Sequence, residues 1–147
     1  MCNTLYLTHE FEACQASANE MVRVATKYDL PVYGAIGSFW LGATRAMHGD
    51  VTNGLRQMEP GIEPLNGIGL FTLLPAVVMV DTLARGGRDR DALALITQVL
   101  GKTSDPQIGM FVSELWRIRG ELTARERGGD MALAERSLQA ALRIARG

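Results

Sequence analysis

Apolar side chains recur every three to four residues through most of the chain, which is the spacing of an amphipathic helix. The first such stretch, between Glu10 and Asp29, has its apolar positions at Phe11, Cys14, Ala18, Met21, Val22 and Ala25. The second, from Pro31 to His48, has them at Ile36, Phe39, Trp40, Ala43 and Met47. No alternating apolar and polar run flanks an Asn-Gly or Asp-Gly turn as a hairpin requires. The pattern predicts helices throughout and no strand.

The same spacing continues downstream, where prolines interrupt it. Further helices are predicted from Asp50 to about Leu65, from Ile68 to Ala84, from Asp89 to about Leu100, from Pro106 to Arg127 and from Asp130 to Arg146. Pro60 and Pro64 are expected to kink or end their helix, because proline has no N–H to donate. Pro75 leaves two alternatives open: the helix starts near it, or bends there at a cost of ~3 kcal/mol.

Three turns group these helices into pairs. A glycine and a charged residue follow a helical stretch at Gly49, Gly87 and Gly129, which are 38 and 42 residues apart. A period of this size indicates a helical-repeat protein, and tetratricopeptide repeats have a period of about 34 residues. The sequence predicts one domain over residues 1–147, with a repeat remnant at 1–29 and helix pairs at 31–65, 68–101 and 106–146.

The last pair carries the strongest repeat signal. Gly120 lets two helices approach closely, while Ala134 and Ala141 flank the larger Leu138 on the returning helix. The string from Glu114 to Leu122 reads Glu-Leu-Trp-Arg-Ile-Arg-Gly-Glu-Leu. It resembles the most recurrent string of the tetratricopeptide-like arm at the C-terminus of bacterial predicted ATPases, adenylate/guanylate cyclases and transcriptional activators. Further resemblances to that arm lie at Tyr28-Asp29-Leu30-Pro31 and at Leu83-Ala84-Arg85-Gly86-Gly87-Arg88.

This resemblance implies an all-α fold, a right-handed superhelix of about three to four antiparallel helix pairs. It also implies an arm that binds partners and has no active site. Pro75 departs from the family pattern, which has an aromatic or aliphatic residue there. We expect the chain to be the arm alone, either a stand-alone protein or a truncated part of a bacterial signalling protein. Solenoid ends without polar caps expose apolar surface, so we also expect a homodimer, or docking, through the ends.

Composition and charge limit the classes of partner that we expect. Of the 147 residues 47% are hydrophobic and 21% are charged, with a net charge of -1, so no global field favours nucleic acid or a membrane surface. The late arginines are interleaved with glutamates, which is typical of an ion-paired helix surface. The longest apolar run, from Gly67 to Val80, falls short of the ~20 residues that span a bilayer. With no secretory signal at the N-terminus, we expect a cytoplasmic protein.

Few residues of the chain have the types and spacings that catalysis or metal binding requires. Cys2 and Cys14 make no metal-ligand spacing with His9 or His48 and are predicted to be free, buried thiols. His48 is expected to meet the carbonyl end of its helix. Glu59 and Glu63 have i,i+4 spacing on one helix, and they more simply face water than act as an acid and a base. No phosphate loop is present, and His9 and His48 are the only histidines that could act as the base for a nucleophile. We therefore expect no enzyme activity, no cofactor and no metal.

The candidate ligand surface lies on the predicted helix from Pro106 to Arg127. Spacings of three, four and four residues align Glu114, Arg117, Glu121 and Arg125 on one face of it. In tetratricopeptide geometry the first helix of each pair lines the groove, so Asp81, Arg85 and Phe39 are expected to join this face. The alternative is that these charges only solvate a surface. Trp40 and Trp116 are expected in the core.

Two functions follow from this surface. The first is a non-catalytic interaction scaffold of tetratricopeptide type, whose groove binds a protein or peptide. The second is an arm that senses a small ligand and regulates an attached nucleotide cyclase or transcriptional activator. A closed pocket with convergent polar groups would favour the second function, and an open groove the first.

Overall fold

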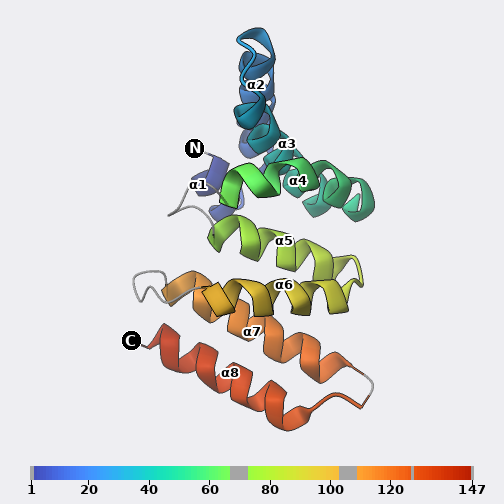
Figure 1. Cartoon of the computed structure of the whole chain (residues 1–147), viewed down its shortest axis with the longest axis vertical. Helices are drawn as coiled ribbons and strands as arrows, with labels where there is room; N and C mark the ends of the chain where they lie inside the picture. Colours follow the sequence, from blue (N-terminus) through green and yellow to red (C-terminus); the bar gives the residue numbers. More distant parts are fainter. Residues whose placement is uncertain (1, 67–72, 103–108, 127, 147) are drawn as a thin grey trace. The chain divides into compact units, whose positions relative to one another are not determined.

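Every regular element of the described chain is a helix. The computed structural model describes residues 2–66, 73–102, 109–126 and 128–146. The helices, labelled in Figure 1, are α1 (Cys2–Leu7), α2 (Phe11–Lys27), α3 (Pro31–Met47), α4 (Val51–Asn66), α5 (Leu73–Arg85), α6 (Asp89–Lys102), α7 (Gly109–Arg125) and α8 (Met131–Ala145). The prediction of an all-helical chain without strands is confirmed for these residues.

Helix ends follow the local sequence signals. Asp50 caps α4 as predicted, since its carboxylate accepts the N–H of Asn53 at 3.4 Å. Asp130 caps α8 in the same way, accepting the N–H of Leu133 at 2.9 Å. Pro31 is the first residue of α3, where its missing N–H costs no hydrogen bond. These two caps and the N-terminal proline explain why the predicted starts of the three helices agree with the structure within one residue.

Glycines with positive φ make the turns between paired helices. Gly49 has φ 100° and Gly87 has φ 70°, a left-handed region that favours glycine. In the last turn the left-handed residue is Gly128, with φ 75°. A Cβ on Gly129 would lie 2.1 Å from the carbonyl oxygen of Thr123, so that position needs glycine for space.

Two prolines lie inside α4 and do not end it. The helix includes Pro60 and Pro64 and runs on to Asn66. Since a proline has no N–H, the carbonyls of Arg56 and Pro60 lose the hydrogen bond they would accept from four residues ahead. Arg56 and Pro60 are both exposed. Water can therefore solvate the freed carbonyls, which allows the helix to continue past both prolines.

Pro75 lies near the start of α5 as described, two residues after Leu73. The residues that decide between a helix start near Pro75 and a bend there, 68–72, lie outside the described residues. The predicted start at 106–108 also lies outside them.

The chain divides into two compact units, Met1–Pro75 and Ala76–Gly147. In the first unit α2 packs on α3, α3 on α4 and α1 on α2. Its largest fully buried side chains are Trp40, Phe39 and Met58. In the second unit α7 packs on α8 and α6 on α7, around Ile96, Leu115 and Leu122. The helical periodicity is the same on both sides of Pro75, so it gave no sign of the division.

Glycines bring paired helices to backbone contact. A Cβ on Gly42 of α3 would lie 2.5 Å from the carbonyl oxygen of Gly54 in α4, and a Cβ on Gly54 would lie 2.7 Å from that of Gly42. A Cβ on Gly37 would lie 2.7 Å from Val22 of α2. On α7, a Cβ on Gly120 would lie 2.7 Å from Leu138 of α8, the close approach predicted for this position. Any side chain at these positions forces the helices apart.

Substitution of Gly42 by alanine is expected to destabilise the first unit by about 1–3 kcal/mol, because the new methyl group meets backbone atoms that cannot move independently. Gly34→Ala, in the same helix, is the matched control: its Cβ would have one neighbour, Ala25, at an ordinary 3.7 Å. The control should be neutral or stabilise by up to about 1 kcal/mol. Thermal and urea unfolding followed by circular dichroism measure both. Equal stabilities of the two variants would contradict the close contact.

Candidate functional site

The predicted polar face of α7 is an ordered row of ion pairs. Arg117 donates from Nε to Glu114 Oε2 at 2.8 Å and from Nη2 to Glu114 Oε1 at 2.5 Å. Its Nη1 donates to Glu121 one turn later. Glu121 in turn faces Arg125, with 3.7 Å between Oε2 and Nη2. The structure thus brings these four residues together as the sequence predicts, and we call them the α7 row.

The α7 row is half-exposed and electrically balanced. The side chains of Glu114, Arg117 and Glu121 are each about 40% exposed, and the row holds two acids and two bases. Hydrogen bonds to Glu114 and then Glu121 raise the pKa of Arg117 despite its partial burial. Intrahelical pairs of this kind stabilise a helix by only ~0.2 to 0.5 kcal/mol each. The row therefore presents oriented polar groups at the surface and contributes little to stability.

The other predicted groove residues have separate placements. Arg85 Nε donates to Asp81 Oδ2 at 2.6 Å along α5, so these two residues form their own ion pair in the second unit. Phe39 is only 1% exposed and packs edge-on against Trp40, with ring centroids 5.3 Å apart in the core of the first unit. The prediction of Phe39 as a ligand contact was wrong, because its ring has no exposed surface.

The two tryptophans differ. Trp40 is 1% exposed, as expected of a core residue. Trp116 is only partly buried, and the guanidinium carbon of Arg119 lies 5.0 Å from its ring centroid. That distance is a cation–π contact, and helical spacing places Trp116 and Arg119 on a different face of α7 from the α7 row.

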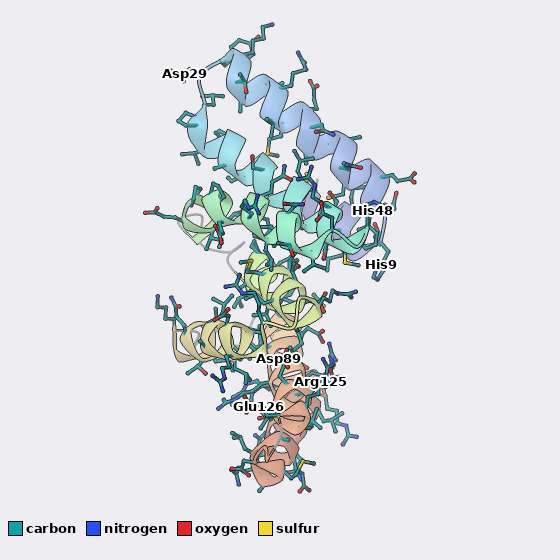
Figure 2. The ribbon with its side chains drawn as sticks, turned by 90° about the vertical axis from the view of Figure 1, so that its right-hand side faces the viewer. His9, Asp29, His48, Asp89, Arg125 and Glu126 are labelled. Carbon is teal, nitrogen blue, oxygen red and sulfur yellow. The ribbon has the colours of Figure 1, made fainter. Side chains whose placement is uncertain are left out.

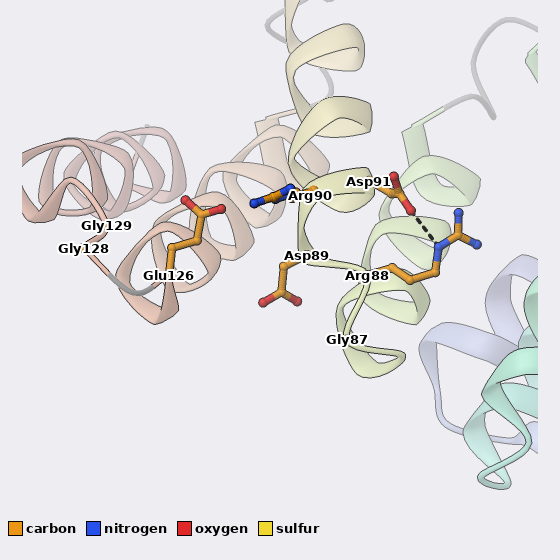
Figure 3. Close-up of a pocket in the computed structure, with 8 residues that line it drawn as sticks. All are labelled: Gly87, Arg88, Asp89, Arg90, Asp91, Glu126, Gly128 and Gly129. Carbon is orange, nitrogen blue, oxygen red and sulfur yellow. Dashed lines mark hydrogen bonds and ion pairs between the residues drawn. The ribbon is translucent and has the colours of Figure 1, made fainter.

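A polar cleft in the second unit was not predicted. Two turns meet there because α6 packs on α7, which brings the turn before α6 beside the turn after α7. The cleft has a volume of about 700 Å³ and is lined by Gly87, Arg88, Asp89, Arg90, Asp91, Glu126, Gly128 and Gly129. Figure 3 shows Asp89 and Glu126 extending from the two turns, while Arg88 Nε donates to Asp91 Oδ2 at 2.7 Å. The only sequence signal for this cleft was the pair of glycine turns.

The two histidines lie in turns of the first unit. His48 is the C-terminal cap of α3, as predicted, and His9 lies in the turn between α1 and α2 (Figure 2). The ring of His9 packs edge-on against Phe11, with centroids 5.5 Å apart. Among the described residues, no group of three or more histidine, cysteine or acidic side chains is placed to hold a metal ion.

Cys2 and Cys14 form a buried thiol pair that joins α1 to α2. Both are free, as predicted, and they are 4% and 0% exposed. Each thiol faces the backbone of the other residue: Cys2 Sγ lies 4.0 Å from the carbonyl oxygen of Cys14, and Cys14 Sγ lies 3.6 Å from that of Cys2. The hydrogen bond from the Cys14 thiol lowers the pKa of Cys2 from 9.0 to about 7, and the same bond raises the pKa of Cys14. The two sulfurs thus share one proton above neutral pH.

One thiolate per chain is expected to appear with a midpoint near pH 7, and no second one below pH 9. Because the pKa of Cys2 is lower folded than unfolded, stability should rise from pH 7 to about 9 and be lost as the pH falls through 7. Above 9 the raised pKa of Cys14 reverses the trend. Absorbance at about 240 nm measures the thiolate. In the Cys14→Ala variant the midpoint should move up; an unchanged midpoint would exclude proton sharing.

No family model, curated protein or solved structure matches the chain. None of the described helices combines the length and apolar character needed to cross a bilayer. The interpretation of the site therefore depends on its own residues, above all the α7 row.

Proposed function

We propose that the chain is a non-catalytic interaction module, a tetratricopeptide-like helical-repeat scaffold that binds a protein or peptide partner through the α7 row. Antiparallel helix pairs joined by glycine turns, with glycine contacts between their backbones, support the helical-repeat interpretation. The string from Glu114 to Leu122 supports a relation to the arms of bacterial signalling proteins. In this proposal the module is cytoplasmic and has no cofactor.

The ordered α7 row is the observation that carries the proposal. Its carboxylates and guanidinium groups are already aligned by their neighbours, so a partner meets fixed hydrogen-bond donors and acceptors. A preorganised surface costs less entropy on binding than one whose long side chains must first be ordered. Arg117 and Arg125 also belong to a residue type that, with tryptophan and tyrosine, is enriched at the hot spots of protein interfaces.

The polar cleft favours a second candidate, the ligand-sensing arm for a nucleotide cyclase or transcriptional activator. Its volume of about 700 Å³ is within the range of small-molecule sites. However, the cleft is open and its lining is charged or glycine, without the apolar walls that bury most of a small ligand. A protein partner therefore remains the preferred proposal.

The first test is a native mass spectrum of the protein purified gently from its own cells. A retained polypeptide is expected for the wild-type chain and should be lost in the triple variant Glu114→Gln, Arg117→Gln, Glu121→Gln. The variant removes the charges and keeps side-chain size at the two glutamates, and helix content should persist because these pairs contribute little to stability.

Glu20→Gln with Arg23→Gln is the matched control, because this ion pair on α2 has the same i,i+3 spacing and is well exposed. The control should keep the polypeptide. A retained small molecule that is lost on Asp89→Asn and Glu126→Gln would instead favour the sensing arm. A chain without any retained molecule, in all of these samples, would contradict both functions.

A further inference from the structure

The last helix has its apolar side chains on the unexpected side. The α8 residues buried in the second unit are small: Ala134, Ser137, Ala140 and Ala141. Of the larger apolar residues, Leu133 and Ile144 are partly buried, whereas Met131, Leu138 and Leu142 are 64%, 38% and 55% exposed. A helix that only closed a core would place leucine and methionine inward and small or polar residues outward. This inverted distribution leaves a second apolar face of α8 exposed to solvent.

The three exposed residues form one continuous stripe. Spacings of seven and four residues place Met131, Leu138 and Leu142 on the same face of the helix. Leu138 is anchored over Gly120 of α7, and Ser113 of α7 donates to the carbonyl oxygen of Ala141 at 3.0 Å. The stripe is therefore held in place by α7. With 15 residues, α8 is about 22 Å long, which matches a partner helix of about four turns.

The border of the stripe is basic, most strongly at its C-terminal half. Gln139, Leu142, Arg143 and Arg146 line a shallow hollow of about 450 Å³. Residues 137–146 contain two arginines and no acid. Toward the start of the helix acids are present: Arg136 lies 3.8 Å from Asp130, and Glu135, which accepts a hydrogen bond from Gln139, adds a further negative charge. The positive charge that remains is at the hollow.

We propose that α8 is a docking surface for an acidic amphipathic helix of a partner protein. The apolar side chains of that helix cover Met131, Leu138 and Leu142, and one of its carboxylates enters the hollow between Arg143 and Arg146. Arginine binds carboxylate through two parallel hydrogen bonds, so two arginines beside an apolar floor select an acid. The proposal rests on the proposed function as a protein-binding module, but it places this contact on a different helix from the α7 row.

Charge also argues against a second copy of the chain as the occupant. A second α8 would present the same basic half, with Glu135 as its only acid within the helix. Arg136 already faces Asp130 and one Glu135 can meet one more arginine, so two such faces still leave one arginine of each copy without a counter-charge, and unpaired charge at an interface opposes binding. An acidic helix neutralises them.

The test uses the whole chain and two synthetic amphipathic peptides of about 15 residues, the length that spans α8. Both have leucines at helical spacing; one has glutamates along the borders of the leucine face, and the other has lysines in their place. Fluorescence anisotropy of the labelled peptides should show at least tenfold tighter binding of the acidic peptide, weakening as salt is added. The double variant Arg143→Glu, Arg146→Glu should reverse this preference.

A second pair of variants tests whether the peptide binds the stripe itself or any exposed apolar side chains. Met131→Ala with Leu142→Ala should weaken the acidic peptide at least tenfold. Val32→Ala with Tyr33→Ala on α3 is the matched control, because these residues are 49% and 57% exposed. The control should bind as the wild type does. All four substituted side chains are largely in solvent, so thermal unfolding should confirm that each variant folds.

Equal binding of the two peptides, or loss of binding in the α3 control, would overturn the proposal. So would a dimer in sedimentation equilibrium that disappears in Met131→Ala with Leu142→Ala, because the occupant would then be a second copy. The native mass spectrum separates this surface from the proposed function. If Met131→Ala with Leu142→Ala keeps the polypeptide that the triple α7 variant loses, binding through the α7 row is supported and docking on α8 is contradicted.

Discussion

Backbone contact between paired helices is the constraint on which the rest of the structure depends. At Gly42 and Gly54 each helix occupies the space that a Cβ of the other would need, and Gly120 gives Leu138 the same room between α7 and α8. Close approach increases the number of van der Waals contacts per residue, so small residues can hold helices together without large apolar side chains. This is why α8 can bury alanine and serine and still be firmly placed. The large side chains are then available for other surfaces.

The two polar features of the surface have different origins. The α7 row is aligned by helical spacing alone and needs no tertiary contact to form. The polar cleft is different, because it forms only where the packing of α6 on α7 brings two turns together. One surface is thus a property of a single helix and the other is a property of the fold.

That difference explains how much could be predicted. Helices, caps at Asp50 and Asp130, and the α7 row depend on residues within one or two turns of each other, and the sequence was sufficient for them. The burial of Phe39 and the cleft around Asp89 and Glu126 depend on neighbours far along the chain. Apolar residues at helical spacing mark a face, but they do not reveal which neighbour covers it. For the same reason, the inverted distribution of side chains on α8 became visible only with its packing known.

Each unit comprises about half of the chain and has a core of its own. A destabilising substitution in one core therefore acts mainly on that unit. Domains of this size bury a smaller share of their surface than larger ones and have little stability to spare. A substitution in the core around Trp40 acts on α1 to α4, while Ile96 and Leu115 support the second unit. The chain can therefore populate half-folded forms in which one unit is open to proteases and the other is intact. A cell that degrades such forms would remove the whole chain after the failure of either half.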